Sequence, residues 1–235
     1  MASEPHEWQQ AFELLATTYR ARGYEAPSAK LIRFTPYHAL PDTATFVAKL
    51  GDQVVATLSV VLDNTLLGLP IESVFADEVA ELRRCGRRLA EVTSLAHRGL
   101  GMREFIPVFV ALIRLATQYA VRRGSDACLI TINPRHRGFY TKAMGFVPLG
   151  SCRSCPSVQD APAEAYLVDE PRMKATAPQM WQQLFGEGPP EAVLPDPAMP
   201  ARWARHFAGQ STQTDRQTID QILRCIEQLG NPRRW

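Results

Sequence analysis

The segment LAEVTSLAH, residues 89–97, places one carboxylate, Glu91, inside an otherwise apolar stretch. Its composition predicts a strand, in which side chains two positions apart share a face, so Thr93 lies beside Glu91. Burial raises the pKa of a carboxylate and suits it to accept a proton near neutral pH. We therefore expect Glu91 to act as a general base, directly or through water, with Thr93 orienting an amine or a water. The alternatives are an exposed strand carboxylate at Glu91 and a Thr93 that only favours β structure.

A second segment, NPRHRGFYTKAMGFVPLG (residues 133–150), joins the apolar strand DACLITI to another strand through a short helix. Pro134 ends the first strand because proline cannot donate a ladder hydrogen bond, and Gly145 suits the C-terminus of the helix. Asn133 lies at the junction, where it can hydrogen-bond a ligand or cap the helix. Tyr140 lies beside Phe139 in the first turns of the helix, and a core aromatic is one interpretation of it.

The elements that position these residues alternate along the chain. Residues 6–19 carry apolar side chains at helical spacing and predict an amphipathic first helix. Residues 43–50 and 54–62 predict two antiparallel strands joined by a short turn. The remaining patterns predict helices over 71–88, 105–123 and 135–144, strands over 89–97, 126–132, from 146 and over 163–169, and a loop over 150–162.

The region after Pro178 differs in composition, being rich in Pro, Gln and Trp. It carries helical patterns over residues 180–185, 201–206 and 214–229. We expect two parts, an α/β domain over residues 1–177 and a C-terminal helical extension over residues 178–235.

Composition restricts the class of protein. The chain has 235 residues, 46% hydrophobic and 21% charged, which is enough for one full core and an appendage. A net charge of only +2 argues against nucleic acid or an anionic membrane as a partner. The longest apolar run, Phe105 to Ile113, is too short to span a bilayer, and the N-terminus has no signal-peptide pattern. We expect a cytoplasmic protein without an integral membrane segment.

Five cysteines, an odd number, favour reduced thiols in such a compartment. Cys152 and Cys155 have the spacing of a metal or redox pair, but no second pair of ligands with similar spacing is present. We expect them to be loop thiols, and we expect no metal site.

The strand-to-helix segment NPRHRGFYTKAMGF resembles a motif of the GNAT acyltransferase superfamily, in which Asn, a helix Tyr and a terminal Gly-Phe recur. The resemblance implies a sheet splayed next to this strand, with free backbone groups that hold the pantetheine arm of an acyl thioester. In that superfamily a loop with a cation, two glycines or small residues and a helix N-terminus receives the coenzyme A pyrophosphate. The corresponding stretch here is RGLGMR, where Arg98 and Gly101 match but Arg103 replaces a small residue. This departure argues against coenzyme A as the donor.

Residues 31–169 look like the FeeM-type N-acyl amino acid synthases, which are GNAT-like enzymes related to autoinducer synthases. The likeness rests on Asp63, the turn Gly68-Leu69-Pro70, Glu78 with Leu82-Arg83, the strand EVTSLA from Glu91, NPRHRGFYTKAMGF, and PSVQDAPAEAYLV. It implies transfer of a long-chain acyl group from an acyl carrier protein to the α-amine of an amino acid. Autoinducer synthases carry Glu-x-Ser-Arg at the same strand, so Ser94 in place of that Arg argues against a homoserine-lactone product.

The resemblance also implies roles for individual residues. Glu91, Thr93 and Tyr140 form the catalytic set, in which the Tyr140 phenol protonates the departing thiolate. The acyl donor and its pantetheine arm would contact Ser94, Leu95, Ala96, His97, Gly101 and Asn133. The acidic carrier protein would dock on Arg98, Arg103, Arg135, Arg137 and Lys142. His97, His136 and His38 are bases by residue type, but none lies in a recognisable nucleophile constellation.

We therefore expect a GNAT-like α/β fold, with a mixed, mostly antiparallel sheet flanked by helices and a C-terminal helical extension. The acyl-phosphopantetheine of the carrier protein would be a co-substrate, with no tightly bound cofactor. Two other functions stay open. One is a coenzyme A-dependent GNAT N-acetyltransferase, and the other is a catalytically idle module that binds an acyl carrier.

Overall fold

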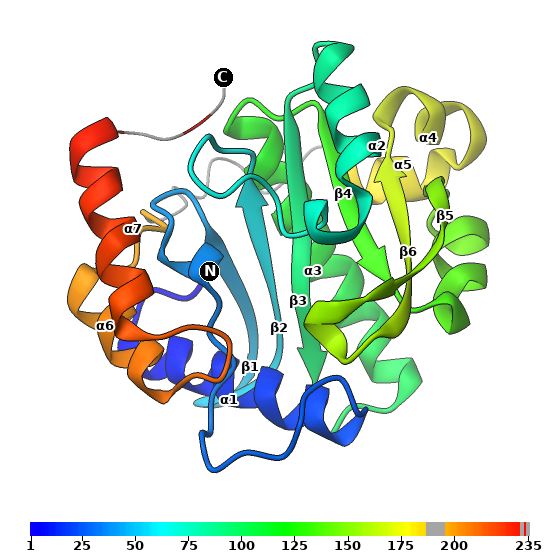
Figure 1. Cartoon of the computed structure of the whole chain (residues 1–235). Coiled ribbons are helices and arrows are strands. Elements are labelled where there is room, and N and C mark those ends of the chain that lie inside the picture. The colour runs from blue at the N-terminus through cyan, green and yellow to red at the C-terminus, as the bar shows by residue number, and fades with distance from the viewer. Residues whose placement is uncertain (187–195, 231–232, 234–235) are drawn as a thin grey trace.

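The computed structural model describes residues 1–186, 196–230 and 233. One six-stranded sheet forms its centre, with helices on both faces (Figure 1). The strands are β1 (Ala44–Leu50), β2 (Gln53–Leu62), β3 (Leu89–His97), β4 (Ala127–Ile132), β5 (Val147–Cys155) and β6 (Ala161–Val168). The helices are α1 (Pro5–Ala21), α2 (Glu72–Arg84), α3 (Met102–Arg122), α4 (Glu170–Thr176), α5 (Pro178–Phe185), α6 (Ala201–Gln210) and α7 (Arg216–Leu229), and a 3₁₀ turn, η1, spans Pro36–Ala39.

The sheet is mixed and splits at its centre. Its strand order is β1-β2-β3-β4-β6-β5, and β3 with β4 is the one parallel pair. These two strands are paired only from Leu89 to Val92 on β3 and from Ala127 to Ile130 on β4. Beyond that point β3 continues to His97 without β4 beside it. The expected splay next to the DACLITI strand is confirmed, and it leaves backbone groups of β3 facing the gap.

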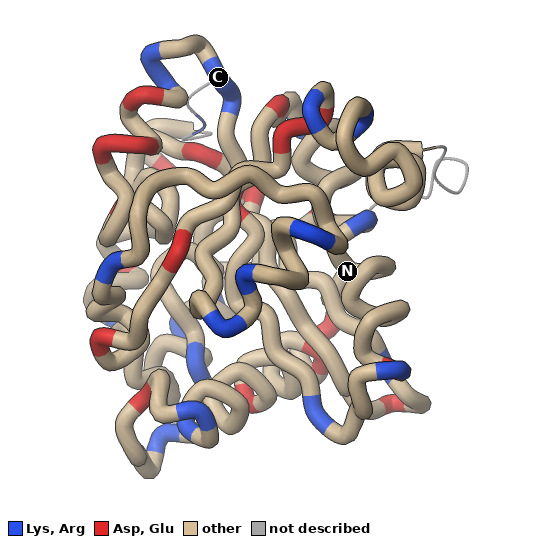
Figure 2. The backbone as a smooth tube through the Cα atoms, turned by 90° about the vertical axis from the view of Figure 1, so that its right-hand side faces the viewer, with Lys and Arg blue, Asp and Glu red and all other residues tan. Residues whose placement is uncertain are grey.

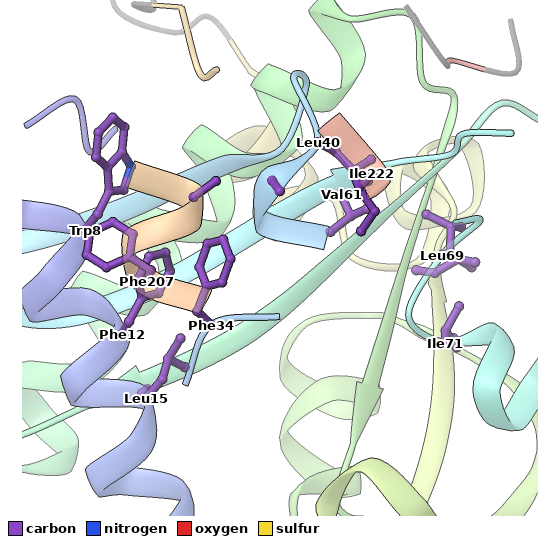
Figure 3. Packing of buried hydrophobic residues seen from close by; sticks show 14 of the residues in the cluster. Trp8, Phe12, Leu15, Phe34, Leu40, Val61, Leu69, Ile71, Phe207 and Ile222 are labelled. Atoms are coloured by element: carbon purple, nitrogen blue, oxygen red, sulfur yellow. The ribbon is translucent and has the colours of Figure 1, made fainter. Parts of the chain in front are cut away.

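The core on one face of the sheet forms between α1 and the C-terminal helices. The apolar stripe of α1, including Trp8 and Phe12, is buried as its helical spacing predicts. The Phe12 ring lies 5.2 Å, centroid to centroid, from Phe34 and 5.2 Å from Phe207 of α6 (Figure 3). The extension therefore packs into the same core as the first helix. Residues 187–195, 231–232 and 234–235 of the expected extension lie outside the described residues.

The opposite face of the sheet is covered by α3. Phe109, Leu112, Ile113 and Ala116 are buried in one cluster with β-strand residues, and α5 packs alongside α3. By length and composition α3 is the one helix in the described part of the chain that could cross a membrane. Because one side of it packs against the sheet, we describe it as a core helix.

Figure 2 shows acidic and basic residues interspersed over the side of the molecule that it presents. No face of one sign dominates this view of the described residues, in agreement with the small net charge. Any electrostatic recognition on this side must therefore be local.

Three local expectations were wrong. Residues 150–155 belong to the strand β5 and not to a loop. Residues 153–155 pair with β6, and a register shift between Leu149 and Arg153 accommodates residues 150–152 within the strand. Cys152 and Cys155 are accordingly strand residues. The helix expected over 135–144 is a 3₁₀ turn (Pro134–His136) followed by one π-helical turn (Phe139–Ala143). The short helix α4, capped by Asp169, was not expected at all.

Candidate active site

A cavity of about 310 Å³ lies where β3 and β4 separate. Its wall comes from the end of α1, η1, the start of α2, the split strands, the β5–β6 connection and the segment after α6. Glu91, Thr93, Ser94 and Asn133 all line it. The period of two along β3 explains this, since Ala90 and Val92 point the other way and pack with α3. The structure thus brings together four of the expected site residues, from two strands.

Of the two interpretations of Glu91, the structure agrees with a buried carboxylate and not with an exposed strand carboxylate. It is 2% exposed, and one carboxylate oxygen accepts a hydrogen bond of 2.7 Å from the backbone N–H of Ile71. Burial raises the pKa of Glu91 to about 8; the nearby Glu72 adds to the rise and the Ile71 N–H opposes it. A carboxylate with such a pKa is matched to accept a proton near neutral pH. Its role as the base stays a prediction.

The Ile71 N–H is held in place by an ion network at the start of α2. The Arg83 guanidinium donates to Asp63 at 2.6 and 2.7 Å and to Glu72 at 2.6 and 2.7 Å. Glu72 in turn accepts the Leu69 N–H at 2.6 Å. Gly68 has φ +66°, and a Cβ there would lie 2.3 Å from Glu72 Oε1. The network therefore fixes the turn that presents an amide to the buried base.

Ser94 interrupts β3 with a left-handed backbone, φ +57°. The β2–β3 register shifts at this point, since Ser59 pairs with Thr93 but Thr57 pairs with Ala96. A residue other than glycine in this conformation indicates a local constraint. The bulge turns Ser94 into the cavity beside Thr93 and places Leu95 against the α3 cluster.

The other residues expected at the donor do not line this cavity. Two of them, Leu95 and Ala96, pack with the hydrophobic cores. His97 is the last residue of β3, and Gly101 lies in the connection to α3. The His97 ring stacks on Phe105 at 4.0 Å, and its buried Nδ1 has no hydrogen-bond partner among the described residues. Burial, followed by the charge of Arg22, lowers the pKa of His97. The N–H of Gly101 donates to the carboxylate of Glu104 at 2.9 Å, so an acidic side chain caps the N-terminus of α3. The donor roles of these residues stay predictions.

Tyr140 lies in an aromatic cluster and not on the cavity wall. Its ring contacts Phe109 at 6.0 Å, Phe139 at 5.3 Å and Phe146 at 5.7 Å. Burial raises the pKa of its phenol. This position agrees with the core interpretation, while the role as an acid is untested. Asn133 Oδ1 accepts the Arg135 N–H at 3.2 Å, so Asn133 both caps the 3₁₀ turn and lines the cavity.

The expected docking cations differ in their surroundings. Arg98, Arg103 and Lys142 have exposed side chains. Arg135 is exposed as well, with its guanidinium 5.8 Å from the Tyr24 ring centroid. Arg137 instead forms an ion pair with the buried Glu164. Arg98 and Arg103, which lie on either side of Gly101, are therefore the best local candidates for a docking surface.

The histidines and cysteines provide no second centre. His38 is buried, its Nδ1 accepts the Thr35 N–H at 3.0 Å, and burial lowers its pKa to about 4. Cys155 lines the cavity with its Sγ 3.2 Å from Ser157 Oγ. In the described part of the chain, no group of three or more His, Cys, Asp or Glu side chains could hold a metal ion.

Several cavity residues were missed by sequence reasoning. Tyr19, Tyr24, Arg33 and Tyr37 come from α1 and the segment that follows it, and Gln213 comes from the extension. Burial, followed by the charge of Glu91, raises the pKa of Tyr37 to about 12, so this phenol lies within the electrostatic reach of the base. The sequence does offer one signal for these residues, the high density of aromatic and basic side chains over 19–38, but this stretch contains no motif.

Comparison with known proteins identifies the family to which this chain belongs. The family model of the N-acyl amino acid synthase FeeM matches residues 10–169, which is more than half of the chain. No curated protein matches the sequence significantly. The solved structure of FeeM, an N-acyl amino acid synthase from uncultured soil microbes, is 30% identical with a TM-score of 0.63; the match covers 73% of this chain and 95% of FeeM.

Two acyl-homoserine lactone synthases share the fold at lower identity. MesI, described as CoA-dependent, is 17% identical with a TM-score of 0.54, and the match covers 81% of this chain and 92% of MesI. LasI is 12% identical with a TM-score of 0.57, and the match covers 80% of this chain and 92% of LasI. The chain is therefore an N-acyltransferase with a GNAT-like fold and belongs to the FeeM family of N-acyl amino acid synthases.

Proposed function

We propose that the protein transfers a long-chain acyl group from an acyl carrier protein to the α-amine of an amino acid, with Glu91 as the general base. The observation that carries the proposal is the buried Glu91, with its pKa raised to about 8, on the wall of a cavity at the split of the sheet. Family membership supports the reaction type. The identity of the acyl donor and the length of the acyl chain are the parts of this function that we propose beyond family membership.

The proposed chemistry is direct transfer in a ternary complex. Glu91 takes a proton from the ammonium of the amino acid, directly or through water, and the free amine attacks the thioester carbonyl carbon. The new C–N bond gives a tetrahedral intermediate, whose oxyanion would be held by β3 backbone N–H groups beyond Val92, where β4 no longer pairs. The C–S bond then breaks, and the pantetheine thiolate leaves and takes up a proton. This proton is the one that Glu91 took from the ammonium, and the second proton of the nitrogen passes to solvent as the amide forms.

The N-terminus of α3 supports a carrier protein over coenzyme A. A pyrophosphate there would meet the Glu104 carboxylate, which already accepts the Gly101 N–H at 2.9 Å, and the Arg103 side chain in a position that is usually small. The exposed Arg98 and Arg103 instead suit the acidic helix of a carrier protein. The carrier's acyl-phosphopantetheine is then a co-substrate, no tightly bound cofactor is needed, and we place the reaction in the cytoplasm.

The test compares donors. Purified protein is incubated with mixed amino acids and either acyl-carrier protein, acyl-coenzyme A or a small acyl-pantetheine thioester, and N-acyl products are measured by mass. We expect the highest kcat/KM with the carrier protein, and we expect added salt to reduce this preference because charge steering is screened over about 8 Å at physiological ionic strength. A higher kcat/KM with acyl-coenzyme A would overturn the donor assignment. Absence of any N-acyl product with all three donors would favour the idle binding module.

Charge reversal tests the docking surface. Arg98→Glu with Arg103→Glu should lower kcat/KM with the carrier protein far more than with the small thioester, since only the protein donor needs the surface. Arg137→Glu is unsuited to this test because it would place a second carboxylate against Glu164. Arg224→Glu, at an exposed position of α7, is the matched control. Equal losses on both donors would assign Arg98 and Arg103 to folding or catalysis.

A further inference from the structure

The connection between α6 and α7, outside the segment that matches the family, reaches the active-site cavity. Ser211 is fully buried; its Oγ accepts the Phe34 N–H at 3.0 Å and donates to the Phe34 carbonyl at 2.7 Å. Lys30 Nζ donates to the Ser211 carbonyl at 2.6 Å. Gln213, two residues further on, lines the cavity. These bonds fix the connection against the segment that carries Arg33.

The same connection helps to hold the buried Glu25–Arg33 pair. Thr212 Oγ1 donates to one oxygen of Glu25 at 2.8 Å, and Arg33 donates to the other at 2.8 Å. Arg20 also binds Glu25, at 3.0 Å. Burial opposes ionisation of Glu25, but its hydrogen bonds to Arg33, Thr212 and Arg20 outweigh burial and lower its pKa. One ionised carboxylate is therefore shared by two guanidinium groups.

Arg33 lines the cavity and has N–H donors that the described residues do not use. Arg33 is the one cation on the cavity wall as far as the structure describes it, and its guanidinium lies 4.5 Å from the Tyr19 ring centroid. An arginine has five N–H donors, and the structure uses two of them here, one on Glu25 and one on the Ser157 carbonyl at 3.0 Å. Because Glu25 is shared with Arg20, the positive charge at the wall is not fully balanced.

The cavity holds further polar atoms without protein partners. The hydroxyls of Tyr24 and Thr131 are buried, and neither forms a hydrogen bond with another described residue. Both residues line the cavity. The one acidic side chain on the described wall is Glu91, whose pKa burial raises, so that its charged form is disfavoured. The cavity thus has a largely apolar wall with several aromatic side chains, in which Arg33 is the cation and Glu91 the carboxyl group among the described lining residues.

We propose that Arg33 and Gln213 bind the carboxylate of the acceptor amino acid, so that the C-terminal extension completes the acceptor subsite. This inference rests on the proposed function, because it assigns the acceptor half of the same site. A guanidinium with free N–H groups recognises a carboxylate, and the Gln213 amide adds a neutral donor. Glu25 and Thr212 are positioning residues that hold Arg33. The acceptor class is a free α-amino acid, in preference to amines or amides.

The test compares the reacting amino acid with its α-amide and its decarboxylated amine, using the full chain and the preferred donor. We expect wild-type kcat/KM to be higher for the free acid by roughly tenfold or more, the size of a lost charge-assisted hydrogen bond. Arg33→Lys and Gln213→Ala should raise KM for the acid, change kcat little, and leave the amide almost unaffected. Gln217→Ala, an exposed glutamine on α7, is the matched control.

Binding without a donor separates this inference from the proposed function. Saturation-transfer NMR with a mixture of free amino acids should show binding to wild type and to Gln217→Ala, with weaker binding to Gln213→Ala. If acylation occurs but acid and amide react equally, or if Gln213→Ala matches Gln217→Ala, the acceptor assignment is overturned while the acyltransferase stands. If no acylation occurs but amino acids still bind through Gln213, the subsite stands and the proposed reaction is wrong. Circular-dichroism melting checks that each variant is folded.

Discussion

The buried carboxylate of Glu91 accepts a hydrogen bond of 2.7 Å from the backbone N–H of Ile71, immediately before α2. This bond ties the centre of β3 to a turn that Arg83, Asp63 and Glu72 hold rigid. Burial favours the neutral acid and the N–H favours the carboxylate, with burial the larger effect. The base is therefore poised between its two forms near the pH at which an enzyme works.

Replacing Glu91 by Gln should lower turnover by about a hundredfold or more, the usual size of a general-base effect. Gln keeps the shape and can still accept the Ile71 N–H, but it cannot take a proton. Single-turnover kinetics would measure the chemical step, and acyl-donor binding should be little changed. A Gln variant with nearly full turnover would exclude Glu91 as the base.

Activity and stability should depend on pH in opposite directions. The ionised base is needed for transfer, so kcat should rise with pH through the Glu91 pKa of about 8. The folded-state pKa lies above the ordinary value of 4.5, so Glu91 contributes stability that is complete below pH 4.5 and is lost as pH rises through about 8. Urea unfolding of wild type and Glu91→Gln between these limits measures this. Parallel curves for the two proteins would contradict a raised pKa.

The presence of Ser at position 94 predicts that the protein does not form an acyl-homoserine lactone. Autoinducer synthases resemble this chain but carry Arg at the corresponding place, whereas Ser94 lines the cavity here with φ +57°. We expect no acyl-homoserine lactone from S-adenosylmethionine with any acyl donor, as measured by mass spectrometry. A lactone signal above the no-enzyme control would remove this assignment and favour the neighbouring family.

The extension should contribute strongly to stability. Phe207 is 1% exposed and packs against Phe12, so Phe207→Ala should lower the free energy of unfolding by about 3–5 kcal/mol. Leu229→Ala, at a position that is 62% exposed, should change it by less than about 0.5 kcal/mol. Chemical denaturation of both variants gives the comparison. Similar small effects would mean that α6 contributes little to the core.

Much of the fold could be predicted because hydrophobic periodicity is local. The β3 boundaries, Leu89–His97, match the segment LAEVTSLAH, and the alternation along it placed Glu91 and Thr93 on one face. The start of the edge strand β5 was predicted, but its second half, residues 150–155, was assigned to a loop because these residues are mostly small or polar and show no apolar alternation. A local pattern does not show which segment the chain pairs with, whether that segment is near in sequence, as β6 is, or far away.

The acceptor side of the site could not be predicted for the same reason. Arg33 and Gln213 lie far apart in sequence and both line the cavity because contacts such as those of Ser211 and Thr212 join their segments. Arg137 shows the same limit, because its sequence position gives no sign of the ion pair that it forms with Glu164, and its docking role stays a prediction. Residue type indicates what a side chain can do, and the partners that the fold supplies decide what it does.

The contact of Phe12 with Phe207 joins the first helix to a segment near the other end of the chain. During synthesis, α1 leaves the ribosome before α6, so the part of the Phe12 ring that Phe207 covers stays open after Phe34 has packed against it. Contacts of such long sequence separation form late and slowly. We therefore expect the cavity wall at Gln213 to form late in folding, after α6 has docked on α1.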